Sequence, residues 1–198
     1  MDQLQVVSLP HTDDLWALLE ALPASMTGEI IGNSLYMMPR PRYRHAEAIF
    51  SLGEKIRSIY QYRGNGGGGN GREYWRILAE PGIELPDARE VSPDIAGWRM
   101  STMPTLPPPD EPIRTVPDWV CEVLSPSSVR YDTGVKREFY ARVGVSWMWN
   151  VDPSVKTVMV FELEHGEWVT RECACGDKFV QLPPFEHAEI PLGEIWNP

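Results

Sequence analysis

The sequence has few cysteines and no long hydrophobic run. Only three of its 198 residues are cysteine, which is too sparse and odd a set for a disulfide framework, so we expect a reducing, cytoplasmic location. No apolar run reaches the roughly 18 residues that a membrane helix needs, so we expect no membrane span. The N-terminal residues have no basic stretch followed by an apolar core, which predicts the absence of a signal peptide. The length fits one domain covering residues 1–198.

Basic residues are outnumbered. The chain has 18 lysines and arginines against 28 aspartates and glutamates, a formal net charge of −10. A negative overall field does not attract nucleic acid, so DNA binding needs a local basic patch or a bridging divalent cation. Arg40, Arg42 and Arg44 concentrate positive charge in the N-terminal half, but arginines on a helix face are more often a solvated surface.

A cysteine pair and a glycine-rich run suggest zinc and phosphate binding, but their sequence context argues against both. Cys173 and Cys175 have the wrong spacing for a zinc knuckle and no second cysteine pair accompanies them, so we interpret them as strand residues. The glycine-rich run 64–71 has no following Lys-Ser/Thr pair and no strand leading into it, which favours a flexible loop over a phosphate-binding loop.

Apolar periodicity predicts an α/β or α+β fold with a mixed β-sheet flanked by helices. Helices are expected over 12–22 and 43–62, and from after residue 127 to Gly144. A hairpin is expected over 29–38, and strands over 74–78, 83–85, 92–98, 118–124, 145–151, 157–163 and 167–170. The proline-rich segment 100–115 is expected to be a stiff excursion between core strands. This segment, Trp147, Met148 and Trp149 are candidates for a dimer contact, although a core position suits the tryptophans better.

Two of the expected strands contain a carboxylate. Asp94 lies in the apolar run 92–98 and Glu122 in the run 118–124, and we expect these strands to be neighbours. Two such carboxylates repel each other unless a divalent cation lies between them, so the pKa of at least one should be raised. Lys136 follows on the next helix and could stabilise charge on a phosphorane-like transition state. Together the three residues indicate metal-assisted phosphodiester hydrolysis.

Spacing alone leaves a structural alternative open. Asp94 could cap a turn, and Glu122 could pair with an arginine. Lys136 could pair with Asp132 on the helix surface, which would stabilise the helix by only about 0.2–0.5 kcal/mol.

Several motifs together resemble the Uma2 family, formerly a domain of unknown function and grouped with the PD-(D/E)XK nuclease superfamily. The resemblance covers most of the chain, and its specific part runs from residue 122 to residue 153. The motifs are Pro93-Asp94, Glu122-Val-Leu-Ser-Pro-Ser127, Tyr131-Asp132 with Lys136, Tyr140-Ala141 with Gly144-Val145, and Trp149-Asn-Val-Asp152-Pro153.

The resemblance implies a restriction-endonuclease-like fold and a metal site. Asp94 and Glu122 would bind Mg²⁺ or Mn²⁺, with the backbone carbonyl of Val123 as a third ligand. Leu124 occupies the position of the superfamily lysine, and the resemblance implies that Lys136 takes over that role.

The resemblance also implies supporting residues and a function. Glu29, His45 and Ser125 are the supporting residues. The expected activity is that of a Mg²⁺-dependent endonuclease that hydrolyses DNA, in a homo-oligomer such as a dimer. The alternative is a non-catalytic binding or oligomerisation module that keeps the fold, which the net charge of −10 favours.

Overall fold

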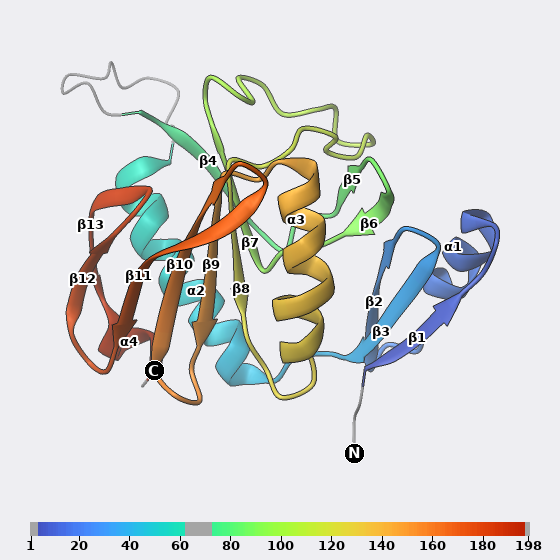
Figure 1. The fold of residues 1–198 in the computed structure, drawn as a ribbon, viewed down its shortest axis with the longest axis horizontal. Coiled ribbons are helices and arrows are strands. Elements are labelled where there is room, and N and C mark those ends of the chain that lie inside the picture. The colour runs from blue at the N-terminus through green and yellow to red at the C-terminus, as the bar shows by residue number, and fades with distance from the viewer. Residues whose placement is uncertain (1–3, 62–72, 197–198) are drawn as a thin grey trace.

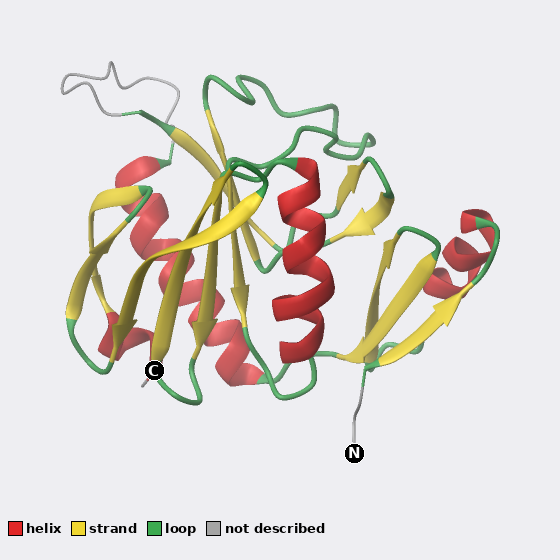
Figure 2. Cartoon of the chain, in the orientation of Figure 1, coloured by secondary structure: helices red, strands yellow, loops and turns green. Residues whose placement is uncertain are grey.

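The computed structural model describes residues 4–61 and 73–196 (Figures 1 and 2). The glycine-rich run 64–71 lies outside the described residues, so the loop expected there is not tested. The elements are β1 (Gln5–Ser8), α1 (Thr12–Glu20), β2 (Met26–Ile31), β3 (Ser34–Pro39), α2 (Tyr43–Tyr60), β4 (Trp75–Ala79), β5 (Ile83–Leu85), β6 (Ala88–Val91), β7 (Ile95–Arg99), β8 (Trp119–Val123), the π-helix η1 (Tyr131–Lys136), α3 (Arg137–Val143), β9 (Trp147–Asp152), β10 (Thr157–Glu164), β11 (Glu167–Cys175), β12 (Phe179–Leu182), β13 (Phe185–Pro191) and α4 (Leu192–Trp196).

A six-stranded mixed sheet forms the centre of the fold, in the order β11-β10-β9-β8-β7-β4. β8 and β9 pair in parallel, which requires a crossover connection, and η1 and α3 provide it. β7 pairs antiparallel with β8, so the two strands expected to carry the carboxylates are neighbours, as predicted. The predicted fold class, a mixed sheet flanked by helices with further antiparallel strands, is confirmed (Figure 2).

Successive side chains of β8 point to opposite faces of the central sheet, and each face has its own hydrophobic core. Cys121 belongs to the core under α2, where Ile56 packs. Val120 belongs to the other core, where Phe139 of α3 packs. Because strand residues alternate between faces, Glu122 points to the same side as Val120, toward the helix that carries Lys136.

A smaller sheet, β1-β3-β2-β6-β5, lies beside the central one, with α1 packed against β2 and β3 (Figure 1). The predicted hairpin is confirmed: β2 and β3 pair across a turn in which Gly32 has a φ of 60°, a conformation that glycine adopts without strain. Glu29 of β2 is buried. The smaller sheet thus contributes a third acidic side chain to the interior.

Several local features differ from expectation, including the strand β1 before the first expected helix. β7 begins at Ile95, so Asp94 precedes the strand instead of lying inside it. Pro93 has no backbone N–H to donate to a strand ladder, which accounts for the late start. β6 and α4 were not anticipated, because elements of four and five residues show no clear periodicity.

Of the segments considered for a dimer contact, residues 147–149 are mostly interior, whereas most of the proline-rich segment is exposed. Met148 and Trp149 are fully buried, and Trp147 packs partly buried against the α2-side core. The tryptophans therefore have the core role, and a dimer stays a prediction.

Cys173 and Cys175 lie in β11, as the strand interpretation requires. In the described ranges 4–61 and 73–196, no helix has the length and apolar character to cross a membrane.

Gly97 in β7 should tolerate no side chain. A Cβ there would lie 3.0 Å from both Ile77 Cδ1 and Trp119 Cε3. We expect Gly97→Ala to lower the free energy of unfolding by about 1–3 kcal/mol through overpacking. Gly53 in α2 is the matched control, because a Cβ there meets only Ile95 at 3.8 Å. Gly53→Ala should raise stability by about 0.5–1 kcal/mol through helix propensity. Urea unfolding measures both, and equal effects would contradict this account.

Candidate active site

A small cavity of about 80 Å³ lies where β2, the start of α2, the end of β8 and η1 meet. The side chains expected at the site all line this cavity: Glu29, His45, Asp94, Glu122, Ser125 and Lys136. We call it the acidic cavity. The structure therefore brings together residues from both sheets and two helices that are far apart in the sequence.

Lys136 lies at the centre of the cluster. Its ammonium Nζ is 2.8 Å from Glu122 Oε1 and 3.2 Å from Glu29 Oε1, and it donates to the Ser92 carbonyl at 3.0 Å. The side chain is almost completely buried. The predicted reach of Lys136 to Glu122 is thus present, and Glu29 is a second partner.

The helix that carries Lys136 is π-helical over Tyr131–Lys136 and α-helical from Arg137. Such insertions are frequent at functional sites, because they turn side chains away from their α-helical positions. Tyr131 and Tyr140 enclose the ammonium, with ring centres 5.7 Å and 6.0 Å from Nζ. Tyr140 also donates its hydroxyl hydrogen to Glu122 Oε1 at 2.6 Å.

Asp94 is held from two directions. Its Oδ2 accepts the N–H of Val123 at 2.6 Å and lies 3.1 Å from His45 Nε2. The hydrogen bond to Val123 ties Asp94 to the end of β8, although Asp94 itself lies outside a strand. His45 comes from the first turn of α2. Both expected metal-binding carboxylates therefore lie in one cavity with defined orientations.

Burial dominates the electrostatics of the cluster. It raises the pKa of Glu122 well above its usual value, although Lys136 opposes this and Asp94 adds to it. The pKa of Glu29 is also raised by burial, against the effect of Lys136. Burial lowers the pKa of Lys136, but the charges of Glu122 and Glu29 outweigh it and raise that pKa above its usual range. The expected raised carboxylate pKa is found at Glu122, with burial as its main cause.

Asp132 does not form the surface pair considered as the alternative for Lys136. It is buried and lines the acidic cavity. Burial raises its pKa to about 7, although Lys136 and a hydrogen bond from Ser128 lower it. A solvated surface role for Lys136 is therefore wrong, since both side chains are interior.

Some residues of this site were not anticipated. Tyr140 had two signals, its place in the motif Tyr140-Ala141 and its position four residues after Lys136, one helical turn away. Tyr131, whose hydroxyl donates to Glu29 Oε2 at 3.3 Å, had no signal besides its motif. Asn150 of β9 is paired in register with Glu122, and its buried Oδ1 has no hydrogen-bond partner in the described part of the chain.

The donor set fits a hard cation in part. Among residues 4–61 and 73–196, no three His, Cys, Asp or Glu side chains are arranged as a ready metal cage. Mg²⁺ does not need such a cage, because it keeps several waters and uses one or two carboxylates. Five acidic residues line the acidic cavity: Glu29, Glu80, Asp94, Glu122 and Asp132. Together these carboxylates can carry more negative charge than the single Lys136 ammonium offsets. This excess favours the binding of a further cation in the cavity.

The comparisons with known proteins agree with this geometry. The family model named Uma2, described as "Putative restriction endonuclease", matches residues 16–193. The chain belongs to the Uma2 family. A similar solved structure is that of "a putative nuclease belonging to DUF820" from Anabaena variabilis ATCC 29413, at 20% sequence identity and a TM-score of 0.65. The likeness covers 92% of this chain and 96% of that one and shows that the fold is shared. No curated protein matches the chain.

Asp132 should give the stability of this Uma2 protein a characteristic pH dependence. An aspartate in an unfolded chain titrates near 3.9. Between about pH 4 and the folded pKa of about 7, only the folded protein keeps the Asp132 proton. Its contribution to the free energy of unfolding therefore falls as pH rises through this window, by up to about 1.4 kcal/mol per pH unit.

Urea unfolding from pH 4 to pH 8 tests this contribution. Asp132→Asn, which cannot titrate, should show a shallower fall than the parent protein across the window. The exposed Asp177→Asn, with the same chemical change, should keep the parent slope. Equal slopes for all three proteins would show that Asp132 is ionised at pH 5 in the folded state.

Proposed function

We propose that this Uma2 protein is a Mg²⁺-dependent endonuclease that hydrolyses phosphodiester bonds of DNA. The observation that carries the proposal is the buried Lys136 ammonium, 2.8 Å from Glu122 in a cavity that Asp94 also lines. Family membership supports a nuclease-like activity. A cluster with a purely structural role needs no excess of buried carboxylates, since burying unpaired charge is costly. A catalytic cluster needs such an excess to bind a cation.

Asp94 and Glu122 hold the cation in this proposal, with the Val123 carbonyl as a further ligand. When bound, Mg²⁺ supplies the positive charge that polarises the phosphate and acidifies a water molecule. The hydrogen bonds from Val123 and His45 orient the Asp94 carboxylate. Tyr140 orients Glu122 in the same way.

Lys136 stabilises charge at the reacting phosphate. Its raised pKa keeps the ammonium protonated at neutral pH. A fixed positive charge in a site that excludes water stabilises developing negative charge more strongly than it would in solvent. Glu29 and the Ser92 carbonyl hold the ammonium in place. Ser125 lines the cavity mouth, with its hydroxyl hydrogen-bonded to those of Ser127 and Ser128.

The metal site predicts a stability change. Saturating Mg²⁺ should raise the melting temperature of the parent protein, because a ligand that binds only the folded state stabilises it, by about 2.7 kcal/mol at 100 times Kd. Asp94→Asn should abolish this shift while keeping the size of the side chain. Asp177→Asn, on the surface, should keep it. A parent protein whose melting temperature ignores Mg²⁺ and Mn²⁺ alike would remove the cation from the proposal.

A test of Lys136 has to remove its positive charge together with one negative charge, so that the buried cluster keeps its net charge. Lys136→Met alone leaves the buried carboxylates of Glu29 and Glu122 without their shared cation, which costs about 3–5 kcal/mol. We therefore pair it with Glu29→Gln and compare the double variant with Glu29→Gln alone. Both should fold, and the double variant should cleave DNA roughly 10²-fold more slowly, the scale for losing one electrostatic stabiliser.

The same assay separates the enzyme from a non-catalytic module. Cleavage of a plasmid and of oligonucleotides is measured with Mg²⁺, with Mn²⁺ and with EDTA. Equal cleavage by the single and double variants would exclude Lys136 from catalysis. If the well-folded parent protein cleaves nothing with either metal, the alternative of a binding or oligomerisation module replaces the proposal.

A further inference from the structure

Two more cavities lie along α2, on either side of His45 in the sequence. The first, which we call the arginine groove, has a volume of about 470 Å³ and is lined by Arg40, Arg42 and Arg44. It shares Arg40, His45 and Ser125 with the acidic cavity, so the two are continuous. In the part of the chain that the structure describes, no carboxylate pairs with any of the three guanidinium groups. Arg40 Nε donates to the Ala24 carbonyl at 2.8 Å and Arg44 Nε to the Tyr43 hydroxyl at 3.3 Å, which leaves their positive charge uncompensated toward a ligand.

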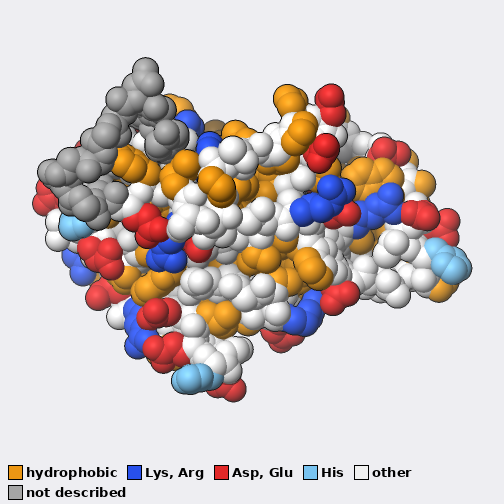
Figure 3. All heavy atoms as spheres, turned by 90° about the horizontal axis from the view of Figure 1, so that it is seen from above, with side chains coloured by type: hydrophobic (Ala, Val, Ile, Leu, Met, Phe, Trp, Pro, Cys, Tyr) orange, Lys and Arg blue, Asp and Glu red, His pale blue; other side chains and the backbone are white. Residues whose placement is uncertain are grey.

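The arginine groove is a local exception to the charge of the protein. The net charge is −10. On the face shown in Figure 3, acidic and basic side chains are interspersed with apolar ones, without one continuous basic surface. In contrast, the first turn of α2 contains no acidic residue, and its N-terminus adds a partial positive charge. The groove at the mouth of the acidic cavity therefore fits a phosphate chain.

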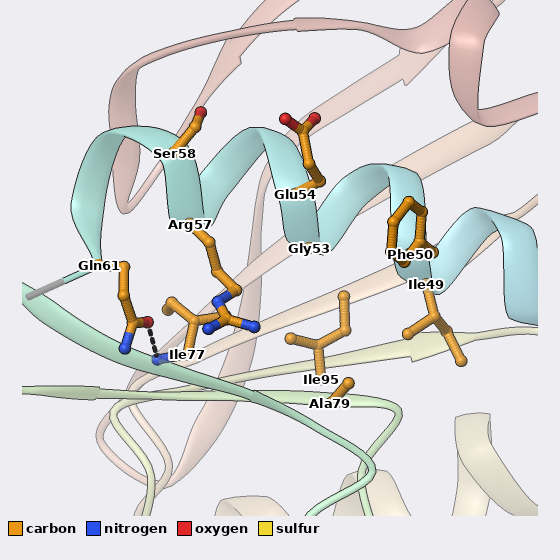
Figure 4. A pocket seen from close by; sticks show the side chains of 10 residues that line it. All are labelled: Ile49, Phe50, Gly53, Glu54, Arg57, Ser58, Gln61, Ile77, Ala79 and Ile95. Carbon is orange, nitrogen blue, oxygen red and sulfur yellow. Dashed lines mark hydrogen bonds between the residues drawn. The ribbon is translucent and has the colours of Figure 1, made fainter.

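The second cavity, which we call the helix–sheet pocket, lies between α2 and the strands β4 and β7 and has a volume of about 560 Å³ (Figure 4). Ile49, Ile77 and Ile95 give it an apolar lining. Gly53 keeps this part of the pocket open, because a side chain there would extend toward Ile95. A glycine inside a helix costs stability, and here it preserves space.

The rim of the helix–sheet pocket has an aromatic ring and a cation. Phe50 is 71% exposed, so its ring is accessible to a ligand at the rim. Figure 4 shows the Arg57 side chain reaching from α2 across the pocket toward Ile77. Gln61 is fixed at the far end, where its Oε1 accepts the Ile77 N–H at 2.9 Å. Glu54 is also at the rim, with Lys55 Nζ 3.6 Å from its carboxylate.

The helix–sheet pocket adjoins the acidic cavity along two strands. Its lining residue Ile95 directly follows Asp94, and Ala79 directly precedes Glu80, which lines the acidic cavity. Arg42 and Arg57 are 15 positions apart along α2, a rise of about 22 Å. At about 3.4 Å per nucleotide in a stacked strand, that distance accommodates several nucleotides.

We propose that one strand of the DNA substrate lies along α2, with phosphates in the arginine groove and an unpaired base in the helix–sheet pocket. This inference rests on the proposed function and adds the form of the substrate. A pocket walled by a helix and a sheet accepts a single base, but not a base that is still paired in a duplex. Phe50 stacks on a base and Arg57 contacts a phosphate, the combination typical of single-strand binding. The preferred substrate is therefore single-stranded DNA or the unpaired segment of a duplex.

Binding without cleavage tests this inference. Fluorescence anisotropy measures the binding of a labelled 16-nucleotide single strand and of the matching blunt duplex, in EDTA and again with Ca²⁺. The parent protein should bind the single strand at least tenfold more tightly. Phe50→Leu should weaken single-strand binding by roughly 5- to 160-fold, the scale for losing one stacked base. Phe50→Tyr, which keeps the ring, should retain it.

Salt titration tests the arginines. Losing one phosphate contact to a single strand lowers the slope of log K against log salt by about 0.7. The Arg42→Gln/Arg44→Gln double variant should therefore lower the slope by about 1.4, and Arg57→Gln by about 0.7. The control is Arg114→Gln/Arg142→Gln, which removes two exposed charges outside these cavities. Its slope should equal that of the parent.

The outcomes separate the two proposals. Equal binding of single strand and duplex, no binding of either, or an unchanged affinity in Phe50→Leu would overturn the α2 path, whatever the cleavage assay shows. Equal salt slopes for the α2 arginine variants and the control would also overturn it. Binding as expected together with no cleavage by the parent protein would leave the α2 path standing and reject the endonuclease.

Discussion

The buried ammonium of Lys136 is the interaction on which the site depends. It joins Glu29 of the smaller sheet to Glu122 of the central sheet, and it is carried by the crossover between β8 and β9. A buried ion pair contributes little net stability, but removing one partner is costly because it leaves a charge uncompensated. The position of one sheet relative to the other is therefore coupled to the protonation of this cluster. The stability of the cluster and the proposed chemistry thus involve the same three side chains.

Negative and positive side chains gather in two adjoining places, the acidic cavity and the arginine groove. The acidic cavity has more carboxylates than its ammonium offsets, and burial raises the pKa of Glu29, Glu122 and Asp132. Three arginines lie directly outside, where the cavity opens into the arginine groove. A divalent cation would be attracted inward and a phosphate chain would be held at the mouth. The net charge of −10 is compatible with nucleic-acid binding on this local scale.

The lysine of this site comes from a helix and not from the strand that carries Glu122. Leu124, two residues after Glu122, donates its N–H to the Val151 carbonyl and so extends the strand pairing by one bond. The crossover helix then returns to the same end of the sheet, and its π-helical segment turns Lys136 inward. Tyr131 and Tyr140 supply the aromatic walls that exclude water from the ammonium.

Periodicity in the sequence determined the main elements. Short apolar runs around Asp94 and Glu122 predicted neighbouring strands, and the strand predicted over 145–151 placed Trp149 in the core. These signals are local, because strand and helix periods involve residues within a few positions of one another. The same apolar context around Glu122 and the helix that follows it indicated that Lys136 could reach the site.

Only the tertiary structure decided the composition of the site. Glu29 and Lys136 are 107 positions apart, and their contact depends on how the two sheets pack. The burial of Asp132 and the π-helical geometry have no periodic signature, since they arise from packing around the crossover. The start of β7 after Asp94 was missed because apolar residues 95–98 concealed the boundary at Pro93. The sequence by itself therefore determined which residues have the chemistry, and packing decided which of them share a charge, because that depends on burial and distance in space.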